Sequence, residues 1–202
     1  MKFINTALRK FLTVVARTLF HLYFRVQVEG AENLQKVQGA VVCSNHKNAF
    51  DPVILMLATK KRYIYFLGKQ ALCKNRLSRW FLCDVLLMNT VGHNGGDIAA
   101  IKWSVTKLRQ GNLVGIFPEG TRNRTQALLL PFEEGAALIA CMAKVPVIPV
   151  SIKTTYKLWS RCKIVYGEPL FFEEYYKGRP DAEAKRAITQ EIRENIEKNL
   201  KK

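Results

Sequence analysis

A strand, a polar loop and a helix are predicted in succession by the stretch Gly39-Ala-Val-Val-Cys-Ser-Asn-His-Lys-Asn-Ala-Phe-Asp-Pro-Val-Ile-Leu-Met-Leu-Ala58. Residues 39–44 form a short apolar run of strand type, and Pro52 opens a helix for which Asp51 is the expected N-cap. His46 then lies in the loop that follows the strand. In open α/β sheets ligands bind at the carboxyl ends of the strands, so His46 has the position of a site residue.

His46 and Asp51 also have the residue types of a general-base pair. A neutral imidazole can take a proton from an attacking hydroxyl, and a nearby carboxylate can fix its tautomer and stabilise the imidazolium that forms. The alternative is structural: an aspartate before a proline is typical of a capped helix start, and His46 is then only a turn residue. This stretch alone leaves both interpretations open.

Composition indicates one globular domain with an anionic partner. The 202 residues are 49% hydrophobic and 24% charged, and 32 Lys and Arg against 16 Asp and Glu give a formal charge of +16. Such a charge favours nucleic acid, an acidic membrane face or a phosphorylated substrate. The five cysteines lack zinc-site spacing, which indicates buried thiols in a reducing, cytosolic setting: Cys43, Cys73, Cys83, Cys141 and Cys162.

Residues 1–24 have the periodicity of an amphipathic helix. Polar residues gather on one side, namely Lys2, Thr6, Arg9, Lys10, Thr13 and Arg17, and apolar residues on the other, namely Ile4, Leu8, Phe11, Val15, Leu19 and Leu22. The uncharged runs are far shorter than the roughly 20 residues that span a bilayer. We predict a helix lying in the membrane surface with its cationic side toward lipid phosphates. The alternative is a helix packed on the domain with its basic side in water.

Apolar runs and helical patterns alternate along the rest of the chain. Strands are expected at 24–29, 39–44, 62–67, 84–89, 112–117, 147–153 and 163–167, and helices at 52–58, 98–110, 132–143 and 181–202. Asp97 is the expected cap of the second helix, and the apolar stripe of the last one is expected to pack in the core. The pattern predicts a single α/β domain over residues 25–202, with a central, mostly parallel sheet flanked by helices.

A basic segment and a polar motif offer sites for an anion. Residues 60–79 contain seven Lys or Arg and no acidic residue, with aromatic residues between them. No nucleic-acid-binding motif accompanies them, so no nucleic acid partner is expected. The motif at 118–124 follows the strand at 112–117 and can face the same crevice as His46. Arg122 or Arg124 can bind a phosphate through two parallel hydrogen bonds, although a surface turn with a Glu-Arg pair is the alternative.

Three motifs in order narrow the choice: Asn-His-x4-Asp at 45–51, Phe-Pro-Glu-Gly-Thr-Arg at 117–122 and Val-Pro-Val-Ile-Pro-Val at 145–150. From about Val26 to Pro169 the chain resembles the 1-acyl-sn-glycerol-3-phosphate acyltransferase family. The resemblance implies transfer of a fatty acyl group from a thioester, acyl-CoA or acyl carrier protein, to the free hydroxyl of 1-acyl-sn-glycerol 3-phosphate, giving phosphatidic acid for phospholipid synthesis.

Two alternatives remain at this point. The acceptor can instead be glycerol 3-phosphate or another lysophospholipid. In a different class, the chain is a non-catalytic basic protein that binds membrane or nucleic acid. The amphipathic helix and the positive charge favour a peripheral or monotopic protein at the cytoplasmic face of the cell membrane, on an anionic surface. We expect no metal, and no cofactor beyond the acyl-CoA or acyl-ACP co-substrate.

The resemblance also implies roles for individual residues. His46 is the general base and Asp51 its orienting carboxylate. The glycerol phosphate is held by Glu119, Gly120, Thr121 and Arg122, and Pro149 lies in the motif associated with the acyl-donor pocket. Asn45, His93 and Arg124 are further candidates. Many family members carry an arginine in the loop before the long helix where this chain has Gly92-His93, so a phosphate ligand there is missing or replaced by His93.

Overall fold

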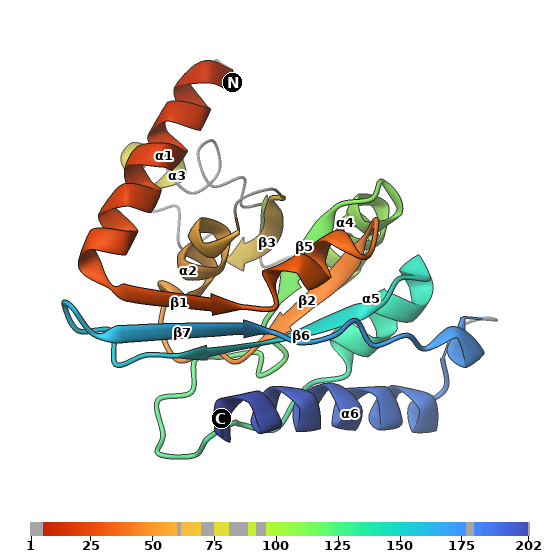
Figure 1. Ribbon diagram of the computed structural model, residues 1–202. Coiled ribbons are helices and arrows are strands. Elements are labelled where there is room, and N and C mark those ends of the chain that lie inside the picture. The colour runs from red at the N-terminus through yellow and green to blue at the C-terminus, as the bar shows by residue number, and fades with distance from the viewer. Residues whose placement is uncertain are drawn as a thin grey trace.

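The described strands form one sheet with the order β1-β7-β6-β2-β5-β3-β4 (Figure 1). The computed structural model describes residues 6–59, 62–69, 75–80, 89–91, 96–176 and 180–201. Strands β2 to β6 run in one direction, while β1 and β7 run parallel to each other and antiparallel to β6. The mostly parallel sheet is therefore confirmed. The strand bounds are β1 Arg25–Glu29, β2 Ala40–Ser44, β3 Ile64–Lys69, β4 Asn89–Val91, β5 Leu113–Ile116, β6 Val147–Lys153 and β7 Arg161–Tyr166.

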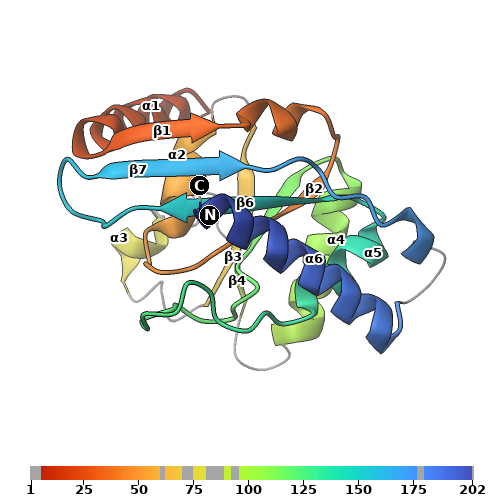
Figure 2. The ribbon, with the colours of Figure 1, turned by 60° about the horizontal axis from the view of Figure 1, so that its bottom comes forward.

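Helices cover both faces of this sheet (Figures 1 and 2). Side chains alternate along β2, so Ala40 and Val42 pack with α1 and α2, while Val41 and Cys43 pack with α4, α5 and α6. The structure is thus a three-layer α/β/α domain. The helix bounds are α1 Thr6–Tyr23, α2 Asp51–Ala58, α3 Arg76–Arg79, α4 Gly96–Arg109, α5 Gly135–Ala143 and α6 Ala182–Lys201, with the short 3-10 helices η1 Ala31–Gln35 and η4 Glu173–Tyr175.

The apolar stripe of the last helix packs in the core, as predicted. Its members on α6 are all buried, namely Ile188, Ile192, Ile196 and Leu200. They join the cluster that contains Val147 of β6 and the apolar residues of α5. A charged helix with one such stripe is held mainly by this burial.

Two expected helix starts differ in the structure. The N-cap of α2 is Phe50, and Asp51 is the first helical residue, because its carboxylate is engaged elsewhere. Helix α4 begins at Gly96, so Asp97 lies within the helix instead of preceding it. Of the expected strand at 84–89 only Asn89 falls within the described residues, and His93 and the rest of the loop at 92–95 lie outside them.

Helix α1 packs on the domain through the side that was expected to be solvated. Phe20 and Phe24 are buried against the core. The guanidinium of Arg17 donates to the carbonyls of Leu57 (3.0 Å) and Thr59 (2.6 Å) at the end of α2. Carbonyls in a last helical turn lack intrahelical partners, and a cation there also complements the helix dipole.

The predicted apolar side of α1 faces outward instead. Phe11, Leu19 and Leu22 are 64%, 60% and 66% exposed, and Val15 is also exposed. The expectation that Arg17 reaches lipid phosphates is therefore wrong, and so is the alternative of a basic side in water at this residue. Residues 1–5 lie outside the described part of the chain. None of the helices in the described ranges combines the length and apolar character needed to cross a bilayer.

Candidate active site

The loops after β2 and β5 meet at one edge of the sheet. The two strands are parallel neighbours, with Cys43 opposite Ile116 near their carboxyl ends. The backbone N–H of Asn123 donates to the carbonyl of His46 (2.7 Å), and the N–H of His46 donates to Glu119 Oε1 (2.7 Å). The prediction that the loops carrying His46 and the 118–124 motif lie at the same sheet edge is thus confirmed.

His46 and Asp51 form a hydrogen-bonded pair. His46 Nδ1 lies 2.9 Å from Asp51 Oδ2, and the imidazole is 17% exposed whereas the carboxylate is fully buried. An ionised carboxylate only accepts hydrogen bonds, so it selects the tautomer with hydrogen on Nδ1. Nε2 then carries the lone pair and has no hydrogen-bond partner among the residues that the structure describes. This nitrogen is the atom that can accept a proton from a substrate.

Asp51 shapes the loop as well as the imidazole. Its Oδ2 accepts hydrogen bonds from the backbone N–H groups of Lys47 and Asn48, both at 2.8 Å. Its Oδ1 accepts one from the hydroxyl of Tyr156 at 2.7 Å. Burial, and then the neighbouring carboxylate, raise the pKa of Tyr156, so its hydroxyl remains a donor. These contacts explain why Asp51 turns back toward the loop and does not cap α2.

The His46 ring rests on a stack of aromatic rings. It lies parallel to Phe117, with ring centroids 4.1 Å apart, and Phe117 stacks in turn on Phe66 at 5.5 Å. A Cβ atom on Gly115 would lie 2.1 Å from the ring of Phe66. Glycine at position 115 therefore leaves room for the Phe66 ring, and so for the stack of Phe66 and Phe117 on which the imidazole lies.

Glu119 connects the two loops to the segment before α5. The residue is 5% exposed, and its carboxylate oxygens accept from the backbone N–H of His46 (2.7 Å) and of Leu130 (2.9 Å). Both oxygens are thus engaged within the protein. Glu119 thus holds the two loops and the segment before α5 together, and its expected contact with glycerol phosphate stays a prediction.

Gly120 is required by the backbone conformation of the same loop. Its φ of 65° lies in the left-handed region, and a Cβ atom there would meet Glu133 Oε1 at 2.4 Å. The N–H of Glu133 donates to the carbonyl of Pro118 (2.8 Å). This bond holds residues before α5 against the loop, and α5 accordingly begins at Gly135, three residues later than predicted.

The remaining residues of the 118–124 motif face solvent. Thr121, Arg122 and Arg124 are exposed, and the two guanidiniums have no partner among the described residues. Asn123 between them is buried; its amide donates to the carbonyl of Ala127 (2.9 Å) and its oxygen accepts from the N–H of Thr125 (3.0 Å). The two exposed arginines thus flank Asn123, the residue whose backbone N–H binds the carbonyl of His46.

Of the other predicted candidates, Asn45 directly follows β2 and Pro149 lies in β6. Asn45 is buried, and its amide donates to the carbonyl of Ile152 (3.0 Å) and accepts from the N–H of Ile152 (2.8 Å). Pro149 is buried in β6 opposite Cys43, against Gly167. These contacts stabilise the end of the sheet beneath His46. His93 lies outside the described residues.

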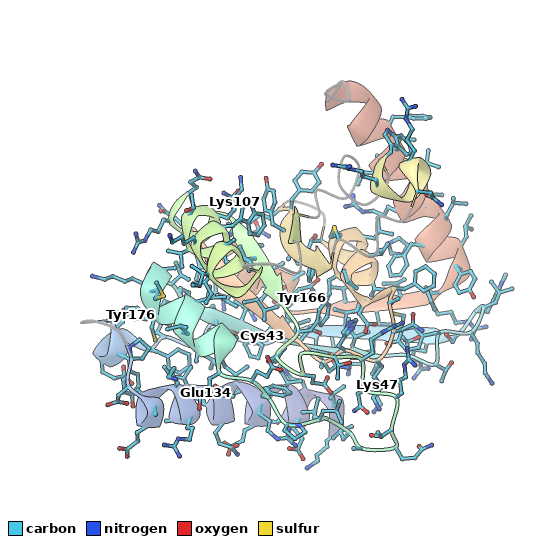
Figure 3. The ribbon with its side chains drawn as sticks, turned by 180° about the vertical axis from the view of Figure 1, so that it is seen from behind. Cys43, Lys47, Lys107, Glu134, Tyr166 and Tyr176 are labelled. Atoms are coloured by element: carbon cyan, nitrogen blue, oxygen red, sulfur yellow. The ribbon has the colours of Figure 1, made fainter. Side chains whose placement is uncertain are left out.

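Sequence reasoning missed three residues that hold the site. Phe117 was read as the end of a strand, Asn123 was not singled out within its motif, and Tyr156 carried no local signal because it lies 105 residues after Asp51. Lys47, labelled in Figure 3, also joins the two loops, because its Nζ donates to the carbonyl of Ala127 (3.1 Å). Only the topology brings these segments together.

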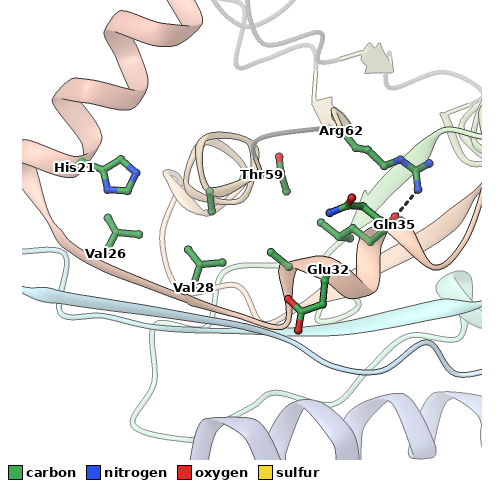
Figure 4. A pocket seen from close by; sticks show the side chains of 10 residues that line it. His21, Val26, Val28, Glu32, Gln35, Thr59 and Arg62 are labelled. Carbon is green, nitrogen blue, oxygen red and sulfur yellow. Dashed lines mark hydrogen bonds between the residues drawn. The ribbon is translucent and has the colours of Figure 1, made fainter.

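A groove of about 480 Å³ lies elsewhere, between α1, β1, η1 and the last turn of α2 (Figure 4). It is lined by His21, Val26, Glu32, Thr59 and Arg62, among others. The guanidinium of Arg62 is occupied by backbone carbonyls, including those of Leu34 and Gly111. Because Thr59 follows the last residue of α2 and Asp51 is the first, this groove is at the opposite end of the helix from the His46 pair.

The described residues offer no cluster of three or more His, Cys, Asp or Glu that could hold a metal ion. Cys43, Cys141 and Cys162 are buried and free, and burial raises the pKa of each thiol, that of Cys162 to about 11. Thiols with raised pKa are poor nucleophiles. The groups that the site presents are an imidazole bound to a buried carboxylate and, in the adjoining loop, two exposed guanidiniums.

Comparison with known proteins shows the class to which a chain with this fold and this site belongs. The family model described as Acyltransferase matches residues 25–153, which include both loops. The chain therefore belongs to the acyltransferase family, and it is an O-acyltransferase.

Individual relatives of the chain are 1-acyl-sn-glycerol-3-phosphate acyltransferases. The chain is 28% identical over 193 residues to the 1-acyl-sn-glycerol-3-phosphate acyltransferase of Bacillus subtilis, covering 93% of this chain and 94% of that protein. It is 32% identical to the human 1-acyl-sn-glycerol-3-phosphate acyltransferase alpha over 151 residues, covering 72% of this chain and 52% of that protein. It therefore spans about half the length of this mammalian relative.

A solved structure shares the fold. The crystal structure of the 1-acyl-sn-glycerophosphate (LPA) acyltransferase from Thermotoga maritima superposes with a TM-score of 0.71 at 26% identity, covering 96% of this chain and 80% of that one. The single α/β domain described above is thus an acyltransferase fold.

Proposed function

We propose that this enzyme transfers a fatty acyl group from a thioester to the free hydroxyl of 1-acyl-sn-glycerol 3-phosphate, giving phosphatidic acid for phospholipid synthesis. The observation that carries the proposal is the His46 pair. Its Nδ1 is 2.9 Å from a fully buried carboxylate, and its Nε2 has no partner in the described chain. The names of the relatives support the choice of acceptor.

In the proposed reaction His46 Nε2 takes the proton of the acceptor hydroxyl. The alkoxide oxygen attacks the thioester carbonyl, the C–S bond breaks, and the thiolate leaves and can receive the proton from the imidazolium. Asp51 holds the ring and stabilises the imidazolium while it exists. No acyl group is attached to the enzyme in this scheme, which accords with the raised pKa of Cys43 near the site.

Arg122 and Arg124 are the proposed phosphate contacts. A guanidinium can bind a phosphate through two parallel hydrogen bonds, and neither side chain is engaged by the described part of the protein. Thr121 is exposed in the same loop and offers a hydroxyl. Glu119 and Gly120 would act by shaping this loop, and the role of Pro149 in an acyl-donor pocket remains a prediction.

The site is proposed to work at the cytoplasmic face of the cell membrane, on an anionic lipid surface. Support comes from α1, whose side chains Phe11, Leu19 and Leu22 are exposed to 60% or more. Exposed apolar stripes of this kind bind in the interface of a bilayer. The excess of 16 positive charges favours anionic lipids, and free buried cysteines accord with a reducing compartment.

One assay tests acceptor and donor together. The purified protein is incubated with a labelled acyl-CoA or the matching acyl-ACP and with 1-acyl-sn-glycerol 3-phosphate, glycerol 3-phosphate or lysophosphatidylcholine. We expect the highest kcat/KM with 1-acyl-sn-glycerol 3-phosphate. Faster acylation of glycerol 3-phosphate or of lysophosphatidylcholine would replace the proposed acceptor. No transfer from either donor, together with salt-dependent binding to DNA or RNA, would favour the non-catalytic class.

A further inference from the structure

We propose that Tyr156 is a positioning residue for the His46 pair, an inference that rests on the proposed role of His46 as general base. Tyr156 lies in the connection between β6 and β7, far from the motif loops in sequence. Its hydroxyl donates to Asp51 Oδ1 at 2.7 Å, while the other carboxylate oxygen faces His46 Nδ1 at 2.9 Å. The tyrosine therefore contacts the carboxylate from the side opposite to the imidazole.

Two donors on different oxygens fix the rotation of a carboxylate. The backbone N–H groups of Lys47 and Asn48 hold Oδ2 from the loop side, but no other described group donates to Oδ1. Without the Tyr156 hydroxyl, Oδ1 would be buried without a partner, because Asp51 has no exposed surface. A buried acceptor that loses its donor favours rotation or solvent entry.

The backbone of Tyr156 adopts an uncommon conformation at this contact. Tyr156 has a φ of 59°, in the left-handed region that large side chains rarely adopt, and its N–H donates to Thr154 Oγ1 (3.3 Å). Its ring packs against the buried cluster that includes residues of α2. An uncommon backbone conformation is maintained here at a residue whose single polar group reaches the catalytic carboxylate.

The first test is Tyr156→Phe, which removes one oxygen atom. We expect kcat to fall about 10-fold, because a buried acceptor loses its donor, with the KM of both substrates within about 2-fold of wild type, because substrate contacts are unchanged. Tyr166→Phe is the matched control: its buried hydroxyl lies 3.4 Å from the carbonyl of Leu55 and does not contact Asp51. An equal loss in both variants, or no loss in Tyr156→Phe, would overturn the proposal.

Two further measurements separate positioning from general destabilisation. In an Asp51→Asn background, Tyr156→Phe should lower kcat by less than about 2-fold more, since the two residues act through one interaction. Incorporating 4-aminophenylalanine at position 156 keeps a donor at the same place and should restore kcat. A full 10-fold further loss in the Asp51→Asn background, or no rescue, would contradict the positioning role.

A spectroscopic readout is independent of acyl transfer. In protein labelled with 15N-histidine, the His46 resonances, assigned with the His46→Ala variant, should show hydrogen on Nδ1 in wild type and a tautomer mixture in Tyr156→Phe. If the tautomer changes but wild type transfers no acyl group, the proposed function fails and this inference stands. If wild type is active and the tautomer is unchanged, only this inference fails.

A second inference rests on a different feature, the tip of the same connection. Leu158 and Trp159 are 60% and 65% exposed, and Lys157 and Arg161 beside them are also exposed. The N–H of Trp159 donates to the carbonyl of Tyr23 at the end of α1 (2.7 Å), and both views show the tip beside this end (Figures 1 and 2). The tip therefore adds two exposed apolar side chains at the end of α1 that leads into β1.

We infer that the tip inserts into an anionic bilayer together with α1, an inference that rests on the proposed membrane contact of α1. An exposed tryptophan and leucine between two cations have the apolar and charged character of a membrane-interface contact. In flotation with phosphatidylglycerol and phosphatidylcholine vesicles, Leu158→Ser combined with Trp159→Ser should reduce the bound fraction at least 5-fold. Ile98→Ser combined with Phe171→Ser is the control, since both residues are exposed apolar side chains outside this stripe. Unchanged binding, or equal loss in the control, would overturn the inference.

Discussion

Glu119 shows how a single carboxylate organises this site. Its two oxygens bind backbone N–H groups of His46 and Leu130, which belong to different segments. We expect Glu119→Gln to lower the free energy of unfolding by about 1.5–3 kcal/mol, because an amide can accept only through its oxygen and presents its NH₂ to the other donor. Thermal melting followed by circular dichroism measures the change.

The Glu133→Gln variant is the control for this prediction. Glu133 is exposed, and its carboxylate makes no hydrogen bond with the described residues. A melting temperature for Glu119→Gln as high as that of Glu133→Gln would show that the two backbone contacts contribute little to stability.

Arg122 is expected to act on the substrate and not on the fold. Arg122→Ala should weaken acceptor binding by about 1.5–3 kcal/mol, the loss of one charge-assisted contact, with an unchanged melting temperature. Steady-state kinetics with the lysophosphatidate acceptor measure this as a raised KM. An acceptor KM and a kcat both equal to those of wild type would exclude the role, and Arg124→Ala tests whether the neighbouring guanidinium carries it instead.

The residues of the site were predictable to different degrees for a physical reason. His46 and Asp51 could be singled out because they lie five residues apart, in a loop and at the start of the helix that follows it, and Arg122 because it follows a strand end. Tyr156 could not be found in this way, because only the folded connection between β6 and β7 brings its hydroxyl to Asp51. Residue types can suggest chemistry, but contacts made across the chain decide whether a side chain faces a substrate or holds a loop.

Helix α1 shows the same limit for an element. Its sequence predicts two sides, but not which one the domain covers. Arg17 turns inward because the last carbonyls of α2 need donors, and Phe20 fills the core beside it. The sequence pattern shows only that the two sides of the helix differ. Which side packs on the domain is decided by the carbonyls of the neighbouring helix that lack a donor.

Membrane contact by α1 can be tested without unfolding the domain. Deleting residues 1–24 would also remove the core residues Phe20 and Phe24, so surface substitution is sharper. We expect Phe11→Ser combined with Leu19→Ser to weaken binding to anionic vesicles at least 10-fold, given about 1.5–3 kcal/mol for each large apolar side chain transferred from water. Thr18→Ser, on an exposed position of the same helix, is the control. Vesicle binding equal to wild type in flotation would place the contact elsewhere.

At the scale of the whole molecule, the order of strands creates the site. Strands β2 and β5 are separated by more than sixty residues yet pair directly, with Ala40 opposite Leu113. The alternation of apolar runs predicted a mostly parallel sheet, because strands buried on both faces are continuously apolar. It could not predict the reversed pair β1 and β7 at the edge, which the hairpin between β6 and β7 produces.

The most direct test of the account is the acyl-transfer rate of His46→Ala. A general base contributes roughly 10²- to 10⁴-fold to the rate, so purified His46→Ala should lose at least 100-fold in kcat with 1-acyl-sn-glycerol 3-phosphate. The variant should remain folded, which thermal melting checks, because backbone N–H groups of Lys47 and Asn48 still donate to Asp51 Oδ2. A folded His46→Ala enzyme that transferred acyl groups at a near-normal rate would contradict the central claim.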